Sequence, residues 1–169
     1  KNYNSKSENV FLSVSGTLEN EIIDCIKTLK YHCKAFEINI SSPNTEGLKI
    51  FHNEKKLTNL ILAAKKITTK PIFIKLPPWA KDNKERDDYL SLAYTSIKAG
   101  AQGLIIANSR PYPFDKLAVG KGGLSGEPLK NDTIRMVSEV RNKIGSKPII
   151  IACGGISDEI DVWNCIAAG

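Results

Sequence analysis

The sequence predicts an α/β protein that forms part of a TIM (β/α)8 barrel, and two features of its pattern support this class. Five short apolar runs alternate with five longer amphipathic stretches, which indicates parallel strands joined by right-handed helical crossovers. The units repeat at roughly 30 to 40 residues without the early GxGxxG turn of a doubly wound sheet, and polar, Gly- and Pro-rich residues follow the strand ends, as barrel loops do.

The five apolar runs predict strands that are buried on both faces, because they are almost continuous in apolar residues. They are Val10–Val14, Phe36–Ile40, Pro71–Lys75, Gly103–Ala107 and Pro148–Ala152. The stretches between them carry apolar residues at three- and four-residue spacing, which predicts amphipathic helices. These helices are Leu18–Lys30, Glu54–Ile67, Lys84–Lys98, Asp132–Ile144 and Asp158–Ala168.

Five units do not close an eight-stranded barrel. The chain begins without Met and stops at Gly169, so we expect a fragment in which residues 1–169 are part of a single barrel domain. The longest connection, Ser109 to Lys130, is long for a βα loop, and such length marks functional loops more often than disordered ones.

Composition excludes several classes of protein. Of the 169 residues 41% are hydrophobic and 25% charged, which is typical of soluble globular chains. The net charge of +6 comes from lysines in helix-like stretches beside acidic residues, with no interleaved stacking aromatics, so we expect no nucleic-acid partner. No apolar run approaches the roughly 18 residues that span a bilayer, and a signal-peptide core is absent. We therefore expect a cytoplasmic protein, for which membrane association would need a segment outside this chain.

The cysteines and histidines predict no metal site. The four cysteines form no CxxC pair and have no histidine at metal-binding spacing, so we expect reduced thiols buried as small hydrophobic groups. Both histidines lie away from strand ends, and we interpret them as surface or capping residues. These residues are Cys25, Cys33, Cys153 and Cys165, and His32 and His52.

The most informative segment follows the second predicted strand and runs from Asn39 to Leu48. Its two carboxamides flank a hydroxyl, and this combination suits recognition of a planar ring with alternating N–H and C=O groups. Pro43 would hold Ser42 in an extended conformation, with its hydroxyl pointing forward. On composition alone, a plain turn that caps a strand explains the segment equally well.

The string NISSPNTEGL resembles the active-site loop of dihydroorotate dehydrogenases, in the class 2 form whose base is Ser instead of Cys. Four further strings resemble motifs of that family in the same order along the chain. They are FIKLPP from Phe73, IIANS from Ile105, GGLSGEPL from Gly122 and CGGIS from Cys153. The resemblance covers what would be strands three to seven of the family's barrel.

This resemblance implies an FMN-dependent enzyme of de novo pyrimidine biosynthesis that oxidises dihydroorotate to orotate. Ser42 would abstract the C5 proton while hydride passes to flavin N5, and Thr45 would relay the proton, because a serine hydroxyl alone is a poor base near neutral pH. The predicted substrate-binding residues are Asn39, Asn44, Asn108 and Ser109.

The predicted cofactor-binding residues are Asn39, Lys75, Gly126, Gly154 and Gly155. Lys75 would lie beside the flavin's N1–C2=O edge, where a cation stabilises the reduced flavin. The glycines would approach the ribityl phosphate, and Ser157 would cap the helix that follows. A structural alternative stays open for these residues. Lys75 could be a lysine at a strand end whose ammonium reaches solvent, and the glycines could be ordinary turn residues.

Three features depart from the family pattern. Ser13 stands where the family usually has a flavin-binding Asn, Ala107 stands where Thr is usual, and the loop 110–116 does not match. The electron acceptor stays open between a quinone, which a Ser base suggests, and a partner electron-transfer subunit. We expect a homo-oligomer or a hetero-oligomer.

Two other functions stay open at this point. One is a related FMN barrel that acts on another pyrimidine. The other is a catalytically silent barrel subunit that binds phosphate or flavin.

Overall fold

A computed structural model describes residues 9–42, 47–78 and 83–169. Its main sheet has five parallel strands that neighbour one another in chain order. They are β1 (Phe11–Val14), β2 (Ala35–Asn39), β3 (Ile72–Lys75), β4 (Gly103–Ile106) and β7 (Ile149–Ala152). A doubly wound sheet reverses its strand order at a switch point, whereas this order runs on without reversal, as barrel strands do.

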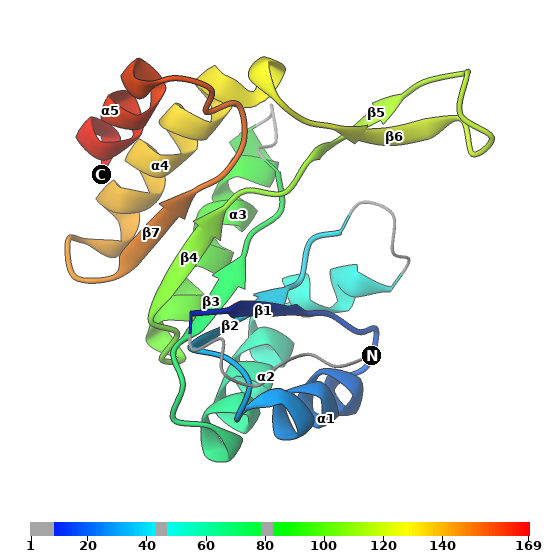
Figure 1. The fold of residues 1–169 in the computed structure, drawn as a ribbon, viewed down its shortest axis with the longest axis vertical. Helices are drawn as coiled ribbons and strands as arrows, with labels where there is room; N and C mark the ends of the chain where they lie inside the picture. Colours follow the sequence, from blue (N-terminus) through cyan, green and yellow to red (C-terminus); the bar gives the residue numbers. More distant parts are fainter. Residues whose placement is uncertain (1–8, 43–46, 79–82) are drawn as a thin grey trace.

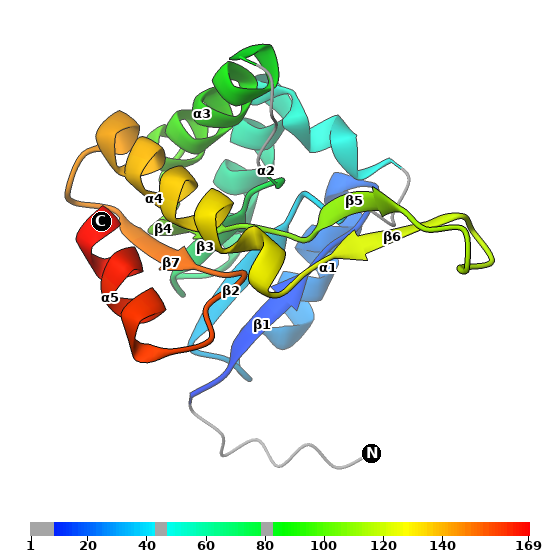
Figure 2. The ribbon, with the colours of Figure 1, turned by 90° about the horizontal axis from the view of Figure 1, so that it is seen from above.

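Five helices cover one face of this sheet, and each contacts the next along the chain. They are α1 (Glu19–Leu29), α2 (Glu54–Ile67), α3 (Asn83–Lys98), α4 (Lys130–Ile144) and α5 (Glu159–Ala168), joined by the short 3-10 helices η1 (Leu48–His52) and η2 (Glu127–Leu129). Figure 2 shows the helices as an arc outside the strands, in chain order from α1 to α5. All ten predicted elements are present, with small differences at their ends.

The main hydrophobic core fills the space between the sheet and the helices. Alternate side chains of the strands point into it, as the two-residue repeat of a β-strand requires. They include Phe36, Ile38, Ile72, Ile74, Leu104 and Ile106, which pack with Ile22, Ile26, Leu57, Leu60 and Ile61 of the helices. Burying one such side chain is worth about 1.5–3 kcal/mol, so this layer carries much of the stability of the described fold.

The opposite, concave face of the sheet carries a second and smaller cluster, formed by Ala35, Phe73 and Ile105. The rings of Phe73 and Phe11 lie with their centroids 5.2 Å apart. Gly103 makes room for this packing, since a Cβ there would lie 2.8 Å from the Phe73 ring. None of the described helices packs on this face, so it is the side that a closed barrel would turn inward.

The prediction that all five strands are buried on both faces is wrong for the two edge strands. On β1, Phe11 is 50% exposed, and on β7, Ile149 is 53% exposed. Both side chains belong to the concave face, and each edge strand has a neighbour on one side only. The apolar runs are explained by a barrel interior that this part of the fold leaves open.

The long connection after β4 forms a hairpin that the sequence analysis did not identify. Its antiparallel strands are β5 (Arg110–Pro113) and β6 (Lys121–Leu124), and Figure 1 shows it projecting away from the main sheet. The strand β5 was not predicted because it contains two prolines, and within sheets proline is mostly confined to edge strands. An ion pair of 2.7 Å between Arg110 and Asp132 joins the base of the hairpin to α4.

The prediction of four buried thiols is wrong for three of them. All four cysteines are free, but only Cys33 is buried, while Cys25 and Cys153 are exposed and Cys165 is intermediate. Cys25 lies on the outward side of α1, and Cys153 follows the edge strand β7 at the open side of the sheet. His32 is exposed, as predicted.

The described residues contain neither a metal-binding cluster nor a membrane-spanning helix. No cluster of three or more His, Cys, Asp or Glu side chains is arranged to hold a metal ion there. Within the same ranges, no helix has both the length and the apolar character needed to cross a membrane.

Candidate active site

Several predicted site residues meet at the carboxyl-terminal edge of the parallel sheet. Asn39 is the last residue of β2, and Lys75, its register partner, is the last residue of β3. Asn108 and Ser109 follow β4, and Gly154 lies just beyond β7. In a parallel sheet all these strand ends lie on one side, so the structure brings the predicted residues to one rim.

A hydrogen-bond network links three polar side chains on this rim. The Asn108 Nδ2 group donates to Asn39 Oδ1 over 3.2 Å and to Ser41 Oγ over 3.1 Å. The backbone N–H of Ser41 also donates to Asn39 Oδ1, over 3.0 Å. Ser41 Oγ lies 3.1 Å from the Lys75 carbonyl oxygen, to which it can donate its hydroxyl proton. The network thus ties together the ends of β2, β3 and β4.

The network also fixes how the Asn39 carboxamide is turned. Its oxygen is occupied by neighbouring donors, while its Nδ2 group has no hydrogen-bond partner in the described part of the chain. A carboxamide held in this way offers an N–H donor to a ligand at a defined position.

Ser41, which is 6% exposed, was not among the predicted site residues. A signal was present, because Asn39 and Ser41 are two residues apart and therefore share one side of an extended chain.

The rest of the predicted loop is described only in part. Ser42 follows Ser41 and is half-buried. Asn44 and Thr45, predicted to bind substrate and to relay the proton, lie outside the described residues.

His52 supports the start of this loop. Its Nε2 group donates to the carbonyl oxygen of Ile40 over 2.9 Å, so the end of η1 is joined to the end of β2. Burial lowers the pKa of His52 below its usual value, more than the bond to Ile40 raises it. His52 is half-buried, and its bond goes to the segment after β2 and not to a helix end, so neither predicted role, surface or capping, describes it.

A charged pair lies on the concave face. One member, Glu37, is two residues before Asn39 on β2, so it lies next to the rim on the same face. Glu37 Oε1 accepts a hydrogen bond from Ser13 Oγ over 2.6 Å and lies 3.8 Å from Lys75 Nζ. The side chains of Lys75 and Glu37 are 20% and 13% exposed. Glu37 was not among the predicted site residues, although a lone acidic residue inside the apolar strand Ala35–Asn39 was a visible signal.

The predicted glycines also come together. A Cβ at Gly155 would lie 3.0 Å from the Gly126 carbonyl oxygen and 2.7 Å from Lys130 Cα, so backbone packing requires glycine there. Gly126, with φ 79°, has open space on its Cβ side instead. Close approach by a ligand is therefore available at Gly126, whereas the Gly155 side is filled by protein.

Ser157 does not cap α5 as predicted. Asp158 is the N-cap, and its side chain accepts from the Asp161 N–H over 2.8 Å. Ser157 instead donates through its N–H and its hydroxyl to Asp161 Oδ2, which Lys130 Nζ also approaches at 3.0 Å. The bond from the Ser157 N–H, followed by that from Lys130, lowers the pKa of Asp161 to about 2. The helix α5 therefore begins one residue later than predicted, with Asp158 at its N-cap.

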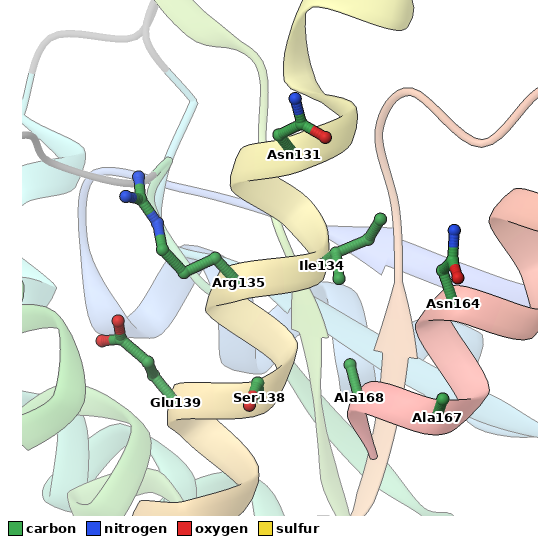
Figure 3. Close-up of a pocket in the computed structure, with 8 residues that line it drawn as sticks. All are labelled: Asn131, Ile134, Arg135, Ser138, Glu139, Asn164, Ala167 and Ala168. Atoms are coloured by element: carbon green, nitrogen blue, oxygen red, sulfur yellow. The ribbon is translucent and has the colours of Figure 1, made fainter.

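Two hollows are present on the described surface. The first lies between α4 and α5, where Figure 3 shows Ile134 of α4 pointing toward Asn164 of α5. It is on the helical side and contains no predicted site residue. The second is lined in part by Asn108, Ala107 and Cys153, so it adjoins the rim.

The sequence as a whole matches one family. The sequence model of the family described as "Dihydroorotate dehydrogenase" matches residues 1–169. The chain belongs to the dihydroorotate dehydrogenase family.

Relatives of two named kinds are similar to this chain. One is "Dihydroorotate dehydrogenase (quinone)" of Sulfurimonas denitrificans, 35% identical over 151 residues, which cover 89% of this chain and 42% of that protein. Another is "Dihydroorotate dehydrogenase B (NAD(+)), catalytic subunit" of Saccharolobus solfataricus, 32% identical over 167 residues, which cover 95% of this chain and 54% of that protein. The chain spans about half the length of these relatives.

Solved dihydroorotate dehydrogenase structures share the fold. A crystal structure of DHODH from Eimeria tenella in complex with ferulenol has a TM-score of 0.77 and 27% sequence identity, covering 89% of this chain and 46% of that chain. The ligand-free type of the same enzyme gives a TM-score of 0.77 and covers 48% of that chain. This likeness confirms the predicted class, in which the five βα units are part of a TIM barrel.

Proposed function

We propose that the full-length protein oxidises dihydroorotate to orotate with FMN as cofactor, as a step of pyrimidine biosynthesis. The observation that carries this proposal is the Asn39, Ser41 and Asn108 network beside Lys75, on one rim of a chain that matches the family throughout. Residues 1–169 would then be part of a single FMN-binding barrel domain.

The residues at the rim suit a flavin nucleotide. Lys75 offers a cation, Asn39 offers an N–H donor, and Gly126 leaves its backbone open to close approach. When bound, FMN supplies the acceptor for the hydride of the substrate.

The chain's own residues would bind and deprotonate the substrate. Asn39, Asn44, Asn108 and Ser109 would pair with the edges of the pyrimidine ring, since amides and hydroxyls can both donate and accept. Ser42 would take the C5 proton and pass it to Thr45 or to water, because a serine hydroxyl needs a relay to act as a base.

Two kinds of relative support two electron acceptors. A quinone acceptor is favoured by the Ser base and by the S. denitrificans relative, and an NAD(+)-linked partner subunit by the S. solfataricus relative. The finer assignments, namely oligomeric state and a cytoplasmic or membrane-associated location, are decided by purifying the full-length protein from cell fractions and assaying it with each acceptor.

The test is an absorbance spectrum of the full-length protein before and after anaerobic addition of dihydroorotate. We expect a flavin spectrum that bleaches on addition. A protein that binds flavin but bleaches only with uracil-type substrates would support the related FMN barrel. A colourless protein that stays apo with added FMN would contradict the proposal and support a silent subunit.

A further inference from the structure

Glu37 places a carboxylate on the concave face of the sheet, two residues before Asn39 of the polar rim. Its neighbours across the strands are Ser13 on β1 and Phe73 on β3. The main core lies on the opposite face, where Phe36 and Ile38 of the same strand point. Glu37 therefore contributes nothing to the packing between strands and helices.

The carboxylate makes two contacts through one oxygen atom. Ser13 Oγ donates to Glu37 Oε1 over 2.6 Å, and the ammonium of Lys75 lies 3.8 Å from the same oxygen. In the described ranges, Glu37 is the only acidic side chain within ion-pair distance of Lys75. The hydroxyl of Ser13 thus holds the carboxylate in a place where it faces the lysine of the rim.

A largely buried carboxylate is costly to the fold. Removing a charge from water is unfavourable unless a partner compensates for it, and well-packed apolar residues often stabilise a fold more than a buried ion pair does. Glu37 is 13% exposed among apolar neighbours such as Phe73, so stability alone does not explain a charged residue here.

We propose that Glu37 is a positioning residue, which holds the Lys75 ammonium on the concave face and offsets part of its charge toward a bound flavin. The Glu37 and Lys75 pair, not Lys75 alone, then sets how strongly the site favours the reduced flavin. This inference rests on the proposed function, because Lys75 faces a flavin only if the full-length protein binds one.

Glu37→Gln in the full-length protein tests the effect on the flavin. The substitution keeps the size of the side chain and removes its charge, so an uncompensated Lys75 should stabilise the reduced flavin more strongly. We expect the midpoint potential of the bound flavin to rise, with the ratio of reduced to oxidised flavin at a given potential increasing about threefold to tenfold. Tenfold corresponds to about 30 mV for a two-electron couple.

Two further variants serve as controls. Glu37→Asp keeps the charge and should leave the potential closer to that of the wild-type protein. Asp24→Asn removes a carboxylate from the exposed ion pair with Lys27 and should not move the potential. A potential that is the same in Glu37→Gln and wild type would contradict the proposal.

A second measurement needs no flavin. The Lys75 amino group of the apoprotein is labelled with an acylating reagent, and the labelled peptide is quantified by mass spectrometry. Labelling should rise about threefold in Glu37→Gln, because the ammonium loses the carboxylate that holds it. Unchanged labelling would overturn the pair.

The two measurements separate this inference from the proposed function. If the wild-type protein binds no FMN, the proposed function fails, while labelling still decides whether Glu37 holds Lys75. If labelling of Lys75 increased while the midpoint potential of the flavin stayed the same, Glu37 would pair with Lys75 without affecting the flavin. That result would overturn the proposed effect on the flavin.

Discussion

The side-chain amide of Asn108 donates to the carboxamide oxygen of Asn39 over 3.2 Å, although 69 residues separate them in the sequence. The contact forms because β2 and β4 flank β3 in the sheet and both residues stand at strand ends. Each carboxamide therefore fixes the other, and the rim carries oriented amide groups before any ligand binds.

Asn108→Ala should weaken substrate binding more than it weakens the fold. It removes a donor from Asn39 and the proposed contact to the substrate, and the loss of such a bond is worth about 1–3 kcal/mol, or roughly 5- to 150-fold in affinity. The measurement is the Kd of the full-length protein for orotate. The matched control is Asn164→Ala, which removes an exposed side-chain amide from α5 and should leave that Kd unchanged. Equal Kd values for Asn108→Ala and wild type would contradict the role of Asn108.

Ser42→Ala should keep the flavin bound but slow its reduction by dihydroorotate. Loss of a positioned base slows proton transfer by about 10²- to 10⁴-fold. Stopped-flow absorbance of the full-length protein measures the rate of reduction.

Ser41→Ala offers a comparison within the same loop. Ser41 accepts from Asn108 and is almost fully buried, so its loss should lower the free energy of unfolding by about 1–3 kcal/mol. Near-normal flavin reduction in Ser42→Ala, or a larger loss of rate in Ser41→Ala, would remove Ser42 from the mechanism.

The sequence predicted the sheet and helices well because these elements have strong periodicity. It also predicted that polar residues follow the strand ends, and Asn39, Lys75 and Asn108 share one rim because parallel strand ends lie on one side. It did not predict the role of Ser41 or Glu37, since those depend on which neighbour each side chain meets across the strands. The exposure of Phe11 and Ile149 was equally hidden, because an apolar strand has the same pattern whether its inner face is covered or open.

Gly155→Ala should disturb the turn that we propose to lie beside the FMN phosphate. The new Cβ would meet the Lys130 backbone and the Gly126 carbonyl oxygen, and the φ of +73° already disfavours a side chain. Overpacking and backbone strain of this kind each cost about 1–3 kcal/mol. We expect a lower thermal midpoint and weaker FMN retention.

Gly145→Ala separates backbone strain from packing against the phosphate turn. Gly145 has a similar φ of +78° but has open space around it. It follows the last residue of α4, whereas the Gly155 turn packs against Lys130, the first residue of α4. It should lower the thermal midpoint without weakening FMN retention. Equal retention in both variants would argue against a phosphate role for the Gly155 turn.

Asp161 should make the stability of the α5 turn depend on pH in the acid range. The Ser157 N–H, and after it Lys130, lower the pKa of Asp161 from 3.8 to about 2, so the folded protein favours the charged carboxylate. A carboxylate with a lowered pKa adds stability that is fully present above its unfolded value of 3.8 and is lost as the pH falls toward 2. Asp161→Asn should therefore destabilise the full-length protein at neutral pH and reduce the decline in stability between neutral pH and about pH 2.

Urea unfolding across that range measures both effects. The control is Glu159→Gln, which removes an exposed carboxylate from the same turn. If Asp161→Asn and wild type declined in parallel, the bonds to Ser157 and Lys130 would not distinguish the charged from the neutral carboxyl group.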